Sequence, residues 1–186
     1  MTSGNRQRVP LATALLLLVL TTAVSQAATP GRLGVHATPR SVPEVSFENG
    51  AGDTLTLADF RGRVVALNLW ETWCPPCRKE MPTLDRLQME LGGEHFEVIA
   101  LSIDRAGPGV VRDFYAEEGI ENLKLYIDMS MRAMPRLGVS GIPTTLVLDA
   151  RGREVARLVG EADWATPAML EYFRGLMAAQ TRGGES

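Results

Sequence analysis

Two cysteines, the only ones among the 186 residues, stand three positions apart as Cys74 and Cys77. They follow an apolar run and precede an amphipathic one, so we expect Cys74 to lie at the start of a helix. The unpaired N–H groups and the positive dipole end at that place lower the pKa of a thiol, which makes Cys74 the attacking sulfur. Cys77 lies one turn further along, shielded and close enough to form a disulfide. A nucleophilic thiol beside a resolving thiol is what dithiol–disulfide exchange requires.

Pro75 and Pro76 separate the two cysteines. Proline suits the first helical turn, where a missing N–H costs little and φ is already near its helical value. The alternative to chemistry is a structural bridge. A disulfide stabilises more when it closes a long loop, and a loop of two intervening residues closes almost nothing. The pair therefore favours redox chemistry over a structural role.

The first 27 residues have the pattern of a secretory signal. Two arginines precede an uncharged apolar run over residues 11–24, and small residues follow at 25–27. The run is shorter than the roughly 20 residues that span a bilayer, so we expect cleavage after it, with an uncleaved anchor as the alternative. Export of this kind places the remaining chain in the periplasm.

The composition, 45% apolar and 22% charged, fits one globular domain. A net charge of −3 without concentrated Lys and Arg argues against a nucleic-acid or anionic-lipid partner. We expect residues 28–43, rich in Pro and Gly, to form a linker. Residues 44–180 should form the domain, and residues 181–186 a polar tail.

The elements of this domain are predicted by periodicity and turn residues. Nearly continuous apolar runs at 64–70 and 96–103 are typical of buried parallel strands, and the helix from Cys74 between them completes a β-α-β unit. The remaining expected elements are a hairpin over 45–57, a helix from 110, a strand at 124–127, a short helix within 129–137, a hairpin over 144–159 and a final helix capped by Thr166. This is an α/β domain with a central mixed sheet flanked by helices.

The order of these elements resembles the thioredoxin fold, and in particular the TlpA/ResA-like exported thiol:disulfide oxidoreductases. The resemblance covers residues 40–180. It implies a thioredoxin-like fold with an N-terminal β-hairpin extension, and an enzyme that works through its own dithiol without a cofactor or metal. The residues that carry it are Asn68-Leu69-Trp70, Thr72-Trp73-Cys74-Pro75-Pro76-Cys77-Arg78-Lys79-Glu80-Met81-Pro82 and Val139-Ser140-Gly141-Ile142-Pro143-Thr144.

The resemblance also implies which residues touch the substrate. Trp73 belongs to the redox centre with the two cysteines, and Pro75 and Pro76 lie between them. The peptide bond between Ile142 and Pro143 is cis in this fold and lies beside the disulfide, so that the backbone of Ile142 can pair with an extended substrate. A trans proline at a strand start is the alternative.

Two positions depart from familiar patterns. Cytoplasmic thioredoxins carry a buried aspartate where this chain has Asn68, which cannot exchange a proton. We therefore expect Glu80, one turn after Cys77, to accept the proton of that thiol, the alternative being an ordinary solvated acid. Glu71 stands where small residues are common in the family. We expect it to be exposed at a strand end, the alternative being an electrostatic influence on substrate choice.

The resulting hypothesis is an exported enzyme that reduces disulfides in periplasmic proteins, for example in cytochrome c or oxidase copper-site maturation. Its electrons would come from a membrane thiol carrier of the CcdA or DsbD kind, and it would act as a monomer. A periplasmic dithiol oxidant is one alternative. A reductase of the CcmG type, which acts in cytochrome c maturation, usually has glutamate where Thr144 stands, so this difference argues against that particular assignment. A copper-handling metallochaperone of the same fold is the other alternative. Such a protein usually adds a third metal ligand, often a histidine, to the cysteine pair, whereas we expect His36 and His95 to be ordinary exposed residues.

Overall fold

The structure is a computed structural model that describes residue 1 and residues 33–183, without side chains for 181–183. Apart from residue 1, the predicted export signal over residues 1–27 lies outside the described residues. Within the described part of the chain, no helix has both the length and the apolar character needed to cross a membrane.

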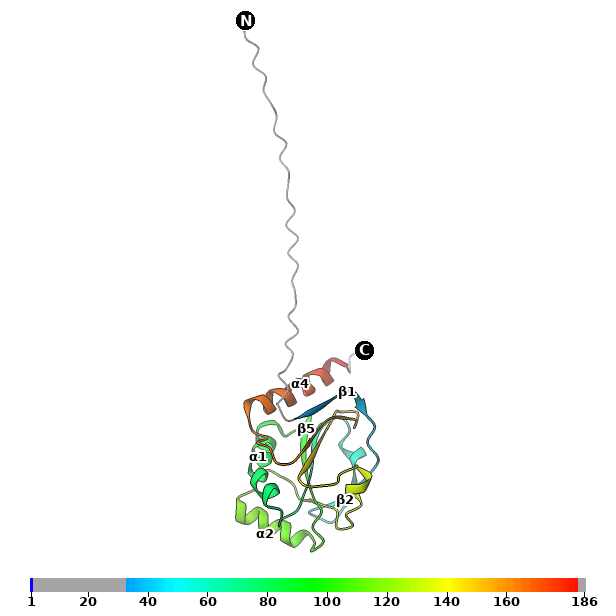
Figure 1. Cartoon of the computed structure of the whole chain (residues 1–186), viewed down its shortest axis with the longest axis vertical. Coiled ribbons are helices and arrows are strands. Elements are labelled where there is room, and N and C mark those ends of the chain that lie inside the picture. Colours follow the sequence, from blue (N-terminus) through cyan, green and yellow to red (C-terminus); the bar gives the residue numbers. More distant parts are fainter. Residues whose placement is uncertain (2–32, 184–186) are drawn as a thin grey trace.

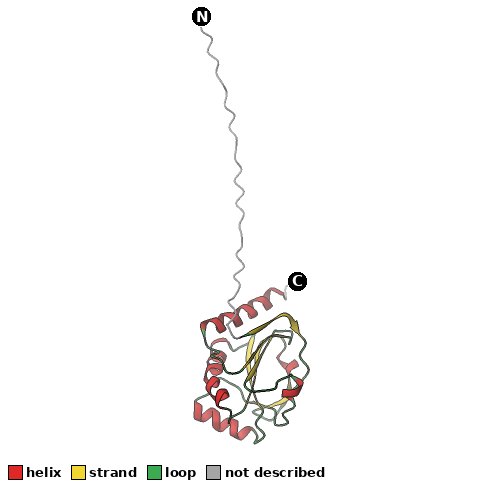
Figure 2. Cartoon of the chain, viewed as in Figure 1, coloured by secondary structure: helices red, strands yellow, loops and turns green. Residues whose placement is uncertain are grey.

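The strands form one sheet of eight in the order β1-β8-β7-β4-β5-β6-β2-β3, with helices around it (Figures 1 and 2). β4, β5 and β6 run parallel, and the other neighbours are antiparallel. The predicted mixed sheet and both predicted hairpins are confirmed. The strands are β1 (Gly34–Arg40), β2 (Ser46–Asn49), β3 (Thr54–Thr56), β4 (Val64–Trp70), β5 (Phe96–Ser102), β6 (Tyr126–Ile127), β7 (Thr144–Leu148) and β8 (Glu154–Val159). The helices are η1 (Leu57–Phe60), α1 (Pro75–Leu91), α2 (Pro108–Glu118), α3 (Ala133–Arg136) and α4 (Pro167–Gly183).

The central strand β4 is buried along its whole length because both faces of the sheet are covered. Alternate residues of a strand point to opposite faces. Val64 and Ala66 belong to the core that the sheet forms with α1, α2 and α4. Val65 and Leu67 belong to a second core, which includes residues of η1 and α3. Asn68 lies two positions after Ala66 on β4, so the two side chains point to the same face of the sheet, the one that α1 covers.

Strand register brings three loops to one edge of the sheet. Trp70, the last residue of β4, pairs with Ser102, the last residue of β5. Leu69 pairs with Thr144, the first residue of β7. The loops that follow β4 and β5 and the loop that precedes β7 therefore meet. The carboxyl ends of parallel strands are where α/β proteins place their sites.

Two boundaries of the predicted domain differ from the structure. Residues 34–40, expected within the linker, form β1 at the edge of the sheet, where Gly34 pairs with Arg157. Nearly all of its side chains are exposed and its pairing is through the main chain, so the strand has no hydrophobic period that the sequence could reveal. Residues 181–183, expected in the polar tail, belong to α4.

Candidate active site

Cys74 and Cys77 form a disulfide with a Cα–Cα distance of 5.2 Å. Cys74 is the N-cap of α1, and its sulfur accepts a hydrogen bond from the backbone N–H of Cys77 at 3.3 Å. This donor is one of the unpaired amides of the first turn, which stabilise a thiolate. Cys74 is 4% exposed and Cys77 is fully buried. As predicted, Cys74 is the more accessible of the two cysteines, although it is more covered than expected.

The loop before the disulfide is anchored to the end of β5. The carboxylate of Asp104 accepts hydrogen bonds from the backbone N–H and the hydroxyl of Thr72, each at 2.9 Å. Ser102 donates a third hydrogen bond to the same carboxylate at 2.8 Å. Trp73 is 70% exposed on this loop. Asp104, which the sequence did not single out, thus fixes the segment that carries Trp73 and Cys74.

Glu71 is buried, contrary to the expectation of an exposed acid. Only 6% of the residue is exposed. Burial, and after it the charge of Asp104, raises the pKa of its carboxyl. Glu71 directly follows β4, and it is covered because the loop after β4 folds back onto the end of β5.

Glu80 is 1% exposed and lies one helical turn after Cys77. Its Oε1 accepts a hydrogen bond from Nδ2 of Asn68 at 2.7 Å. Its Oε2 accepts from the backbone N–H of Ala162 and from Nε1 of Trp164, each at 3.0 Å. Burial raises the pKa of Glu80 to about 7, outweighing these three donors, which favour the ionised form. The alternative of an ordinary solvated acid is therefore wrong.

A cavity of about 320 Å³ reaches Glu80 between α1 and the segment that joins β8 to α4. Lys79 and Glu161 form an ion pair among its lining residues, and Asp163 also lines it. Solvent can therefore approach a carboxyl that is otherwise enclosed.

The peptide bond between Ile142 and Pro143 is cis. It directly precedes β7, whose first residue pairs with Leu69, so the predicted substrate-contact residues lie at the same edge of the sheet as the disulfide. Pro75 is exposed and Pro76 is half-buried on the first turn of α1. The sequence-predicted residues are thus gathered at one edge.

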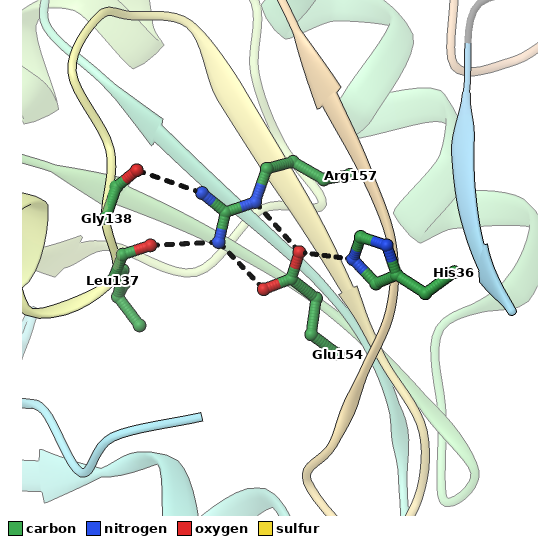
Figure 3. A network of polar contacts seen from close by, with 5 residues as sticks. All are labelled: His36, Leu137, Gly138, Glu154 and Arg157. Atoms are coloured by element: carbon green, nitrogen blue, oxygen red, sulfur yellow. Dashed lines mark hydrogen bonds and ion pairs between the residues drawn. The ribbon is translucent and has the colours of Figure 1, made fainter. Parts of the chain in front are cut away.

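His36, expected to be exposed, instead joins a polar network with residues of β8 and of the loop that precedes β7 (Figure 3). Its Nε2 lies 2.8 Å from Oε1 of Glu154, and Arg157 binds the same carboxylate through Nε and Nη2 at 2.8 and 2.7 Å. Arg157 also donates to the carbonyl oxygens of Leu137 and Gly138, which precede the cis-proline loop (Figure 3). Burial would raise the pKa of Glu154, but hydrogen bonds from Arg157 and His36 hold it below its usual range. Strands β8 and β7 separate β1 from β4, so His36 lies away from the cysteines.

No group of three His, Cys, Asp or Glu side chains with the arrangement of a metal site is found within residues 33–183. His95 is exposed, as expected.

A disulfide at a helix start, placed at the carboxyl end of a central parallel strand beside a cis proline, defines a thioredoxin-fold thiol–disulfide oxidoreductase. The family model described as Redoxin matches residues 38–171, so the chain belongs to the Redoxin family.

Relatives support this assignment. Thiol-disulfide oxidoreductase ResA of Bacillus anthracis is 31% identical over 122 residues, which are 66% of this chain and 69% of the relative. ResA of Bacillus subtilis is 27% identical over 142 residues, 76% of either chain. The chain is accordingly a TlpA/ResA-like oxidoreductase.

Solved structures agree. A putative thiol:disulfide interchange protein DsbE from Chlorobium tepidum superposes with a TM-score of 0.62 at 27% identity, covering 76% of this chain and 96% of that one. A DsbF homologue from Corynebacterium diphtheriae gives a TM-score of 0.62 at 26% identity, covering 83% and 98%.

Proposed function

We propose that this oxidoreductase is exported and reduces disulfides in protein substrates, with Cys74 as nucleophile, Cys77 as resolving thiol and Glu80 as proton acceptor. One observation carries the catalytic part of the proposal. Glu80 is enclosed, hydrogen-bonded at both oxygens and placed one turn after the buried Cys77 on the same helix. Residues three apart on a helix have β-carbons about 5–6 Å from each other, which lets a carboxyl serve a neighbouring thiol.

The reaction passes two electrons from the dithiol to the substrate. The thiolate of Cys74 attacks one sulfur of the substrate disulfide, and the other substrate sulfur leaves as a thiolate. Cys77 then gives its proton to the carboxylate of Glu80 and attacks the sulfur of Cys74. The second substrate sulfur leaves, and the enzyme holds the Cys74–Cys77 disulfide. A further dithiol must reduce this disulfide before the next cycle.

The environment of Glu80 suits a proton acceptor at neutral pH. A general base works best when its pKa is close to the ambient pH, and burial brings this carboxyl to about 7. The cavity lined by Lys79, Glu161 and Asp163 gives the proton a route to solvent once it has left Cys77.

Trp73, Pro75, Pro76, Ile142 and Pro143 are proposed to contact the substrate. Trp73 directly precedes the nucleophile and is 70% exposed, which gives it apolar surface for an incoming chain. The two prolines after the nucleophile border the attack site. The pairing of β7 with β4 supports a position for Ile142 and Pro143 beside these two prolines.

We further propose export through residues 1–27, cleaved or retained as an anchor, and action in the periplasm as a monomer. A compartment that is kept oxidising does not re-reduce the pair by itself, so a membrane thiol carrier of the CcdA or DsbD kind would supply the electrons. Substrates in cytochrome c or oxidase copper-site maturation fit this reaction. The thiol–disulfide names of ResA and DsbE relatives support the chemistry of the proposal.

The resolving step tests the role of Glu80. The reduced whole chain is mixed with a peptide that contains one cystine, and release of the second peptide thiol is followed by stopped flow from pH 5.5 to 8.5. Glu80→Gln should slow release by about 10²-fold, the lower end of general-base contributions, and should remove the rise in rate near pH 7. Glu90→Gln, an exposed acid later on α1, should behave as wild type. A wild-type rate and pH profile for Glu80→Gln would overturn the proposal.

A further inference from the structure

Thr72, two residues before Cys74, has its backbone N–H, its hydroxyl and its carbonyl all bound by charged side chains. The N–H and the hydroxyl donate to the carboxylate of Asp104, each at 2.9 Å. The carbonyl oxygen accepts from Nη1 of Arg78 at 3.3 Å. Asp104 follows β5 and Arg78 lies on α1, so side chains from two parts of the fold hold one residue of the loop.

The guanidinium of Arg78 is itself held by α2. Nη2 lies 2.5 Å from Oε1 of Glu118 and 3.5 Å from Oε2 of Glu117. Cζ lies 4.7 Å from the centroid of the Phe114 ring, within the range of a cation–π contact. Phe114 is buried and packs on Trp70, the last residue of β4, with ring centroids 5.0 Å apart. The guanidinium therefore joins α2 to the segment that follows β4.

An ordinary surface ion pair does not account for this arrangement. Exposed pairs contribute little to stability, and the side chains of Arg78 and Glu118 are 34% and 32% exposed. A guanidinium, however, carries its donors in a rigid planar fork and can bind two acceptors in fixed directions. Arg78 uses one terminal nitrogen for Glu118 and the other for Thr72. The fork thus holds the carbonyl of Thr72 as well as pairing charges.

The position of Thr72 bears on the sulfur of Cys74 through a short stretch of backbone. The N–H of Cys74 donates to the carbonyl oxygen of Glu71 at 3.2 Å, which closes a turn around Thr72 and Trp73. Cys74 is thereby placed as the N-cap of α1, where the N–H of Cys77 reaches its sulfur at 3.3 Å. Such a hydrogen bond stabilises a thiolate only while the donor and the sulfur stay aligned.

We propose that Arg78 is a positioning residue that holds the carbonyl of Thr72 and thereby keeps the sulfur of Cys74 aligned with the first turn of α1. This inference rests on the proposed role of Cys74 as the nucleophile. It assigns a function to the residue that follows the resolving cysteine. Arg78 acts through Thr72, and α2 keeps Arg78 in place.

The charges around the loop act in the same direction. The segments that meet there carry more acids than cations. They are Glu71 on the loop, Asp104 after β5, Glu80 on α1, and Glu117 and Glu118 at the end of α2, beside the cations Arg78 and Lys79. Without Arg78, the two acids of α2 would lose the cation that pairs with them. Loss of Arg78 should therefore disfavour the thiolate of Cys74 twice, through a less well aligned amide and through uncompensated negative charge.

Alkylation of the reduced whole chain measures this effect on the nucleophile. The rate with iodoacetamide from pH 4 to 10, followed by mass spectrometry, gives the titration midpoint of Cys74, the more accessible cysteine. Arg78→Met keeps an apolar stem over Phe114 and removes the donors and the charge. Its midpoint should rise by about one pH unit, which lowers the rate about tenfold below both midpoints. Arg86→Met, an exposed arginine on the same helix, should leave the midpoint unchanged. An unchanged midpoint in Arg78→Met overturns the proposal.

Hydrogen exchange of the oxidised whole chain separates position from charge. In Arg78→Met, the backbone amides of Thr72 and Cys74 should exchange about tenfold faster, because the loop opens more often once the carbonyl is released. Amides of β4, in the centre of the sheet, should exchange as in wild type. Wild-type exchange of the loop in Arg78→Met would leave charge as the only action of Arg78 and overturns the proposal. Equal acceleration in the loop and in β4 would mean general destabilisation, and it overturns the proposal as well.

The outcomes separate this inference from the proposed function. Wild-type behaviour of Arg78→Met, together with slow resolution in Glu80→Gln, rejects this inference alone. A raised midpoint and faster loop exchange in Arg78→Met, together with wild-type resolution in Glu80→Gln, supports this inference and rejects Glu80 as the proton acceptor.

Discussion

Replacing Glu80 by Gln should remove a pH dependence from the stability of the fold. The carboxyl has a pKa of about 7 in the folded chain and 4.5 ordinarily. Between these values the folded state binds more protons than the unfolded state, so the free energy of unfolding falls as pH rises. The contribution is fully present below pH 4.5 and is lost as pH passes through 7. Roughly 2.5 pH units correspond to about 3 kcal/mol.

The assay is urea unfolding of the oxidised whole chain at intervals from pH 4.5 to pH 8.5. Other carboxyls also contribute to the pH dependence, and the difference between wild type and Glu80→Gln isolates this one. Gln has nearly the same volume and resembles the neutral acid, so the difference should grow by about 3 kcal/mol across the range in favour of the variant. Glu90→Gln, an exposed acid on the same helix, is the matched control. Parallel curves for wild type and Glu80→Gln would refute the account of Glu80 as a buried acid of raised pKa.

Three further predictions concern the surroundings of the site. Trp164→Phe removes a donor to the carboxylate and should raise the pKa of Glu80 by about one unit, measured by carbon resonance; an unchanged or lower value would count against the hydrogen bond at 3.0 Å. Cys77→Ser should accumulate a mixed disulfide with a cystine peptide, visible by non-reducing mass spectrometry, whereas Cys74→Ser should give none. The reverse pattern would exchange the roles of nucleophile and resolving thiol. Arg157→Gln leaves the buried carboxylate of Glu154 with His36 as its partner and removes the Arg157 donor from two loop carbonyls, so it should lower the free energy of unfolding in urea by about 2 kcal/mol. The exposed Arg151→Gln should change it little, and equal effects of the two variants would contradict the role of Arg157 in holding Glu154.

The central part of the fold could be predicted because its signals are local. The apolar runs of β4 and β5 and the helical spacing of α1 each identify an element without knowledge of its neighbours. The cysteine pair identifies the chemistry for the same reason. Strand β1 could not be predicted, since an exposed edge strand is held by its backbone and places no constraint on residue type.

The partners of Glu80 illustrate the other limit. Trp164 lies 84 positions from Glu80 in the sequence, and Thr145 lies 77 positions from Asn68. Such contacts arise only when the segment before α4 packs against α1 and when β7 pairs with β4, and no periodicity records them. The burial of Glu71 has a similar origin, because it depends on how the loop after β4 folds onto β5. A residue type and its place on a helix could suggest Glu80, but the network that tunes it required the structure.

The reduction potential of the Cys74–Cys77 pair tests the central claim most directly. The whole chain would be equilibrated against glutathione and a thioredoxin of known potential, and the fraction of disulfide measured by thiol trapping. A reductase that depends on a membrane electron donor should have a value below about −220 mV. A value near about −120 mV would identify an oxidant and contradict the proposed direction of electron flow.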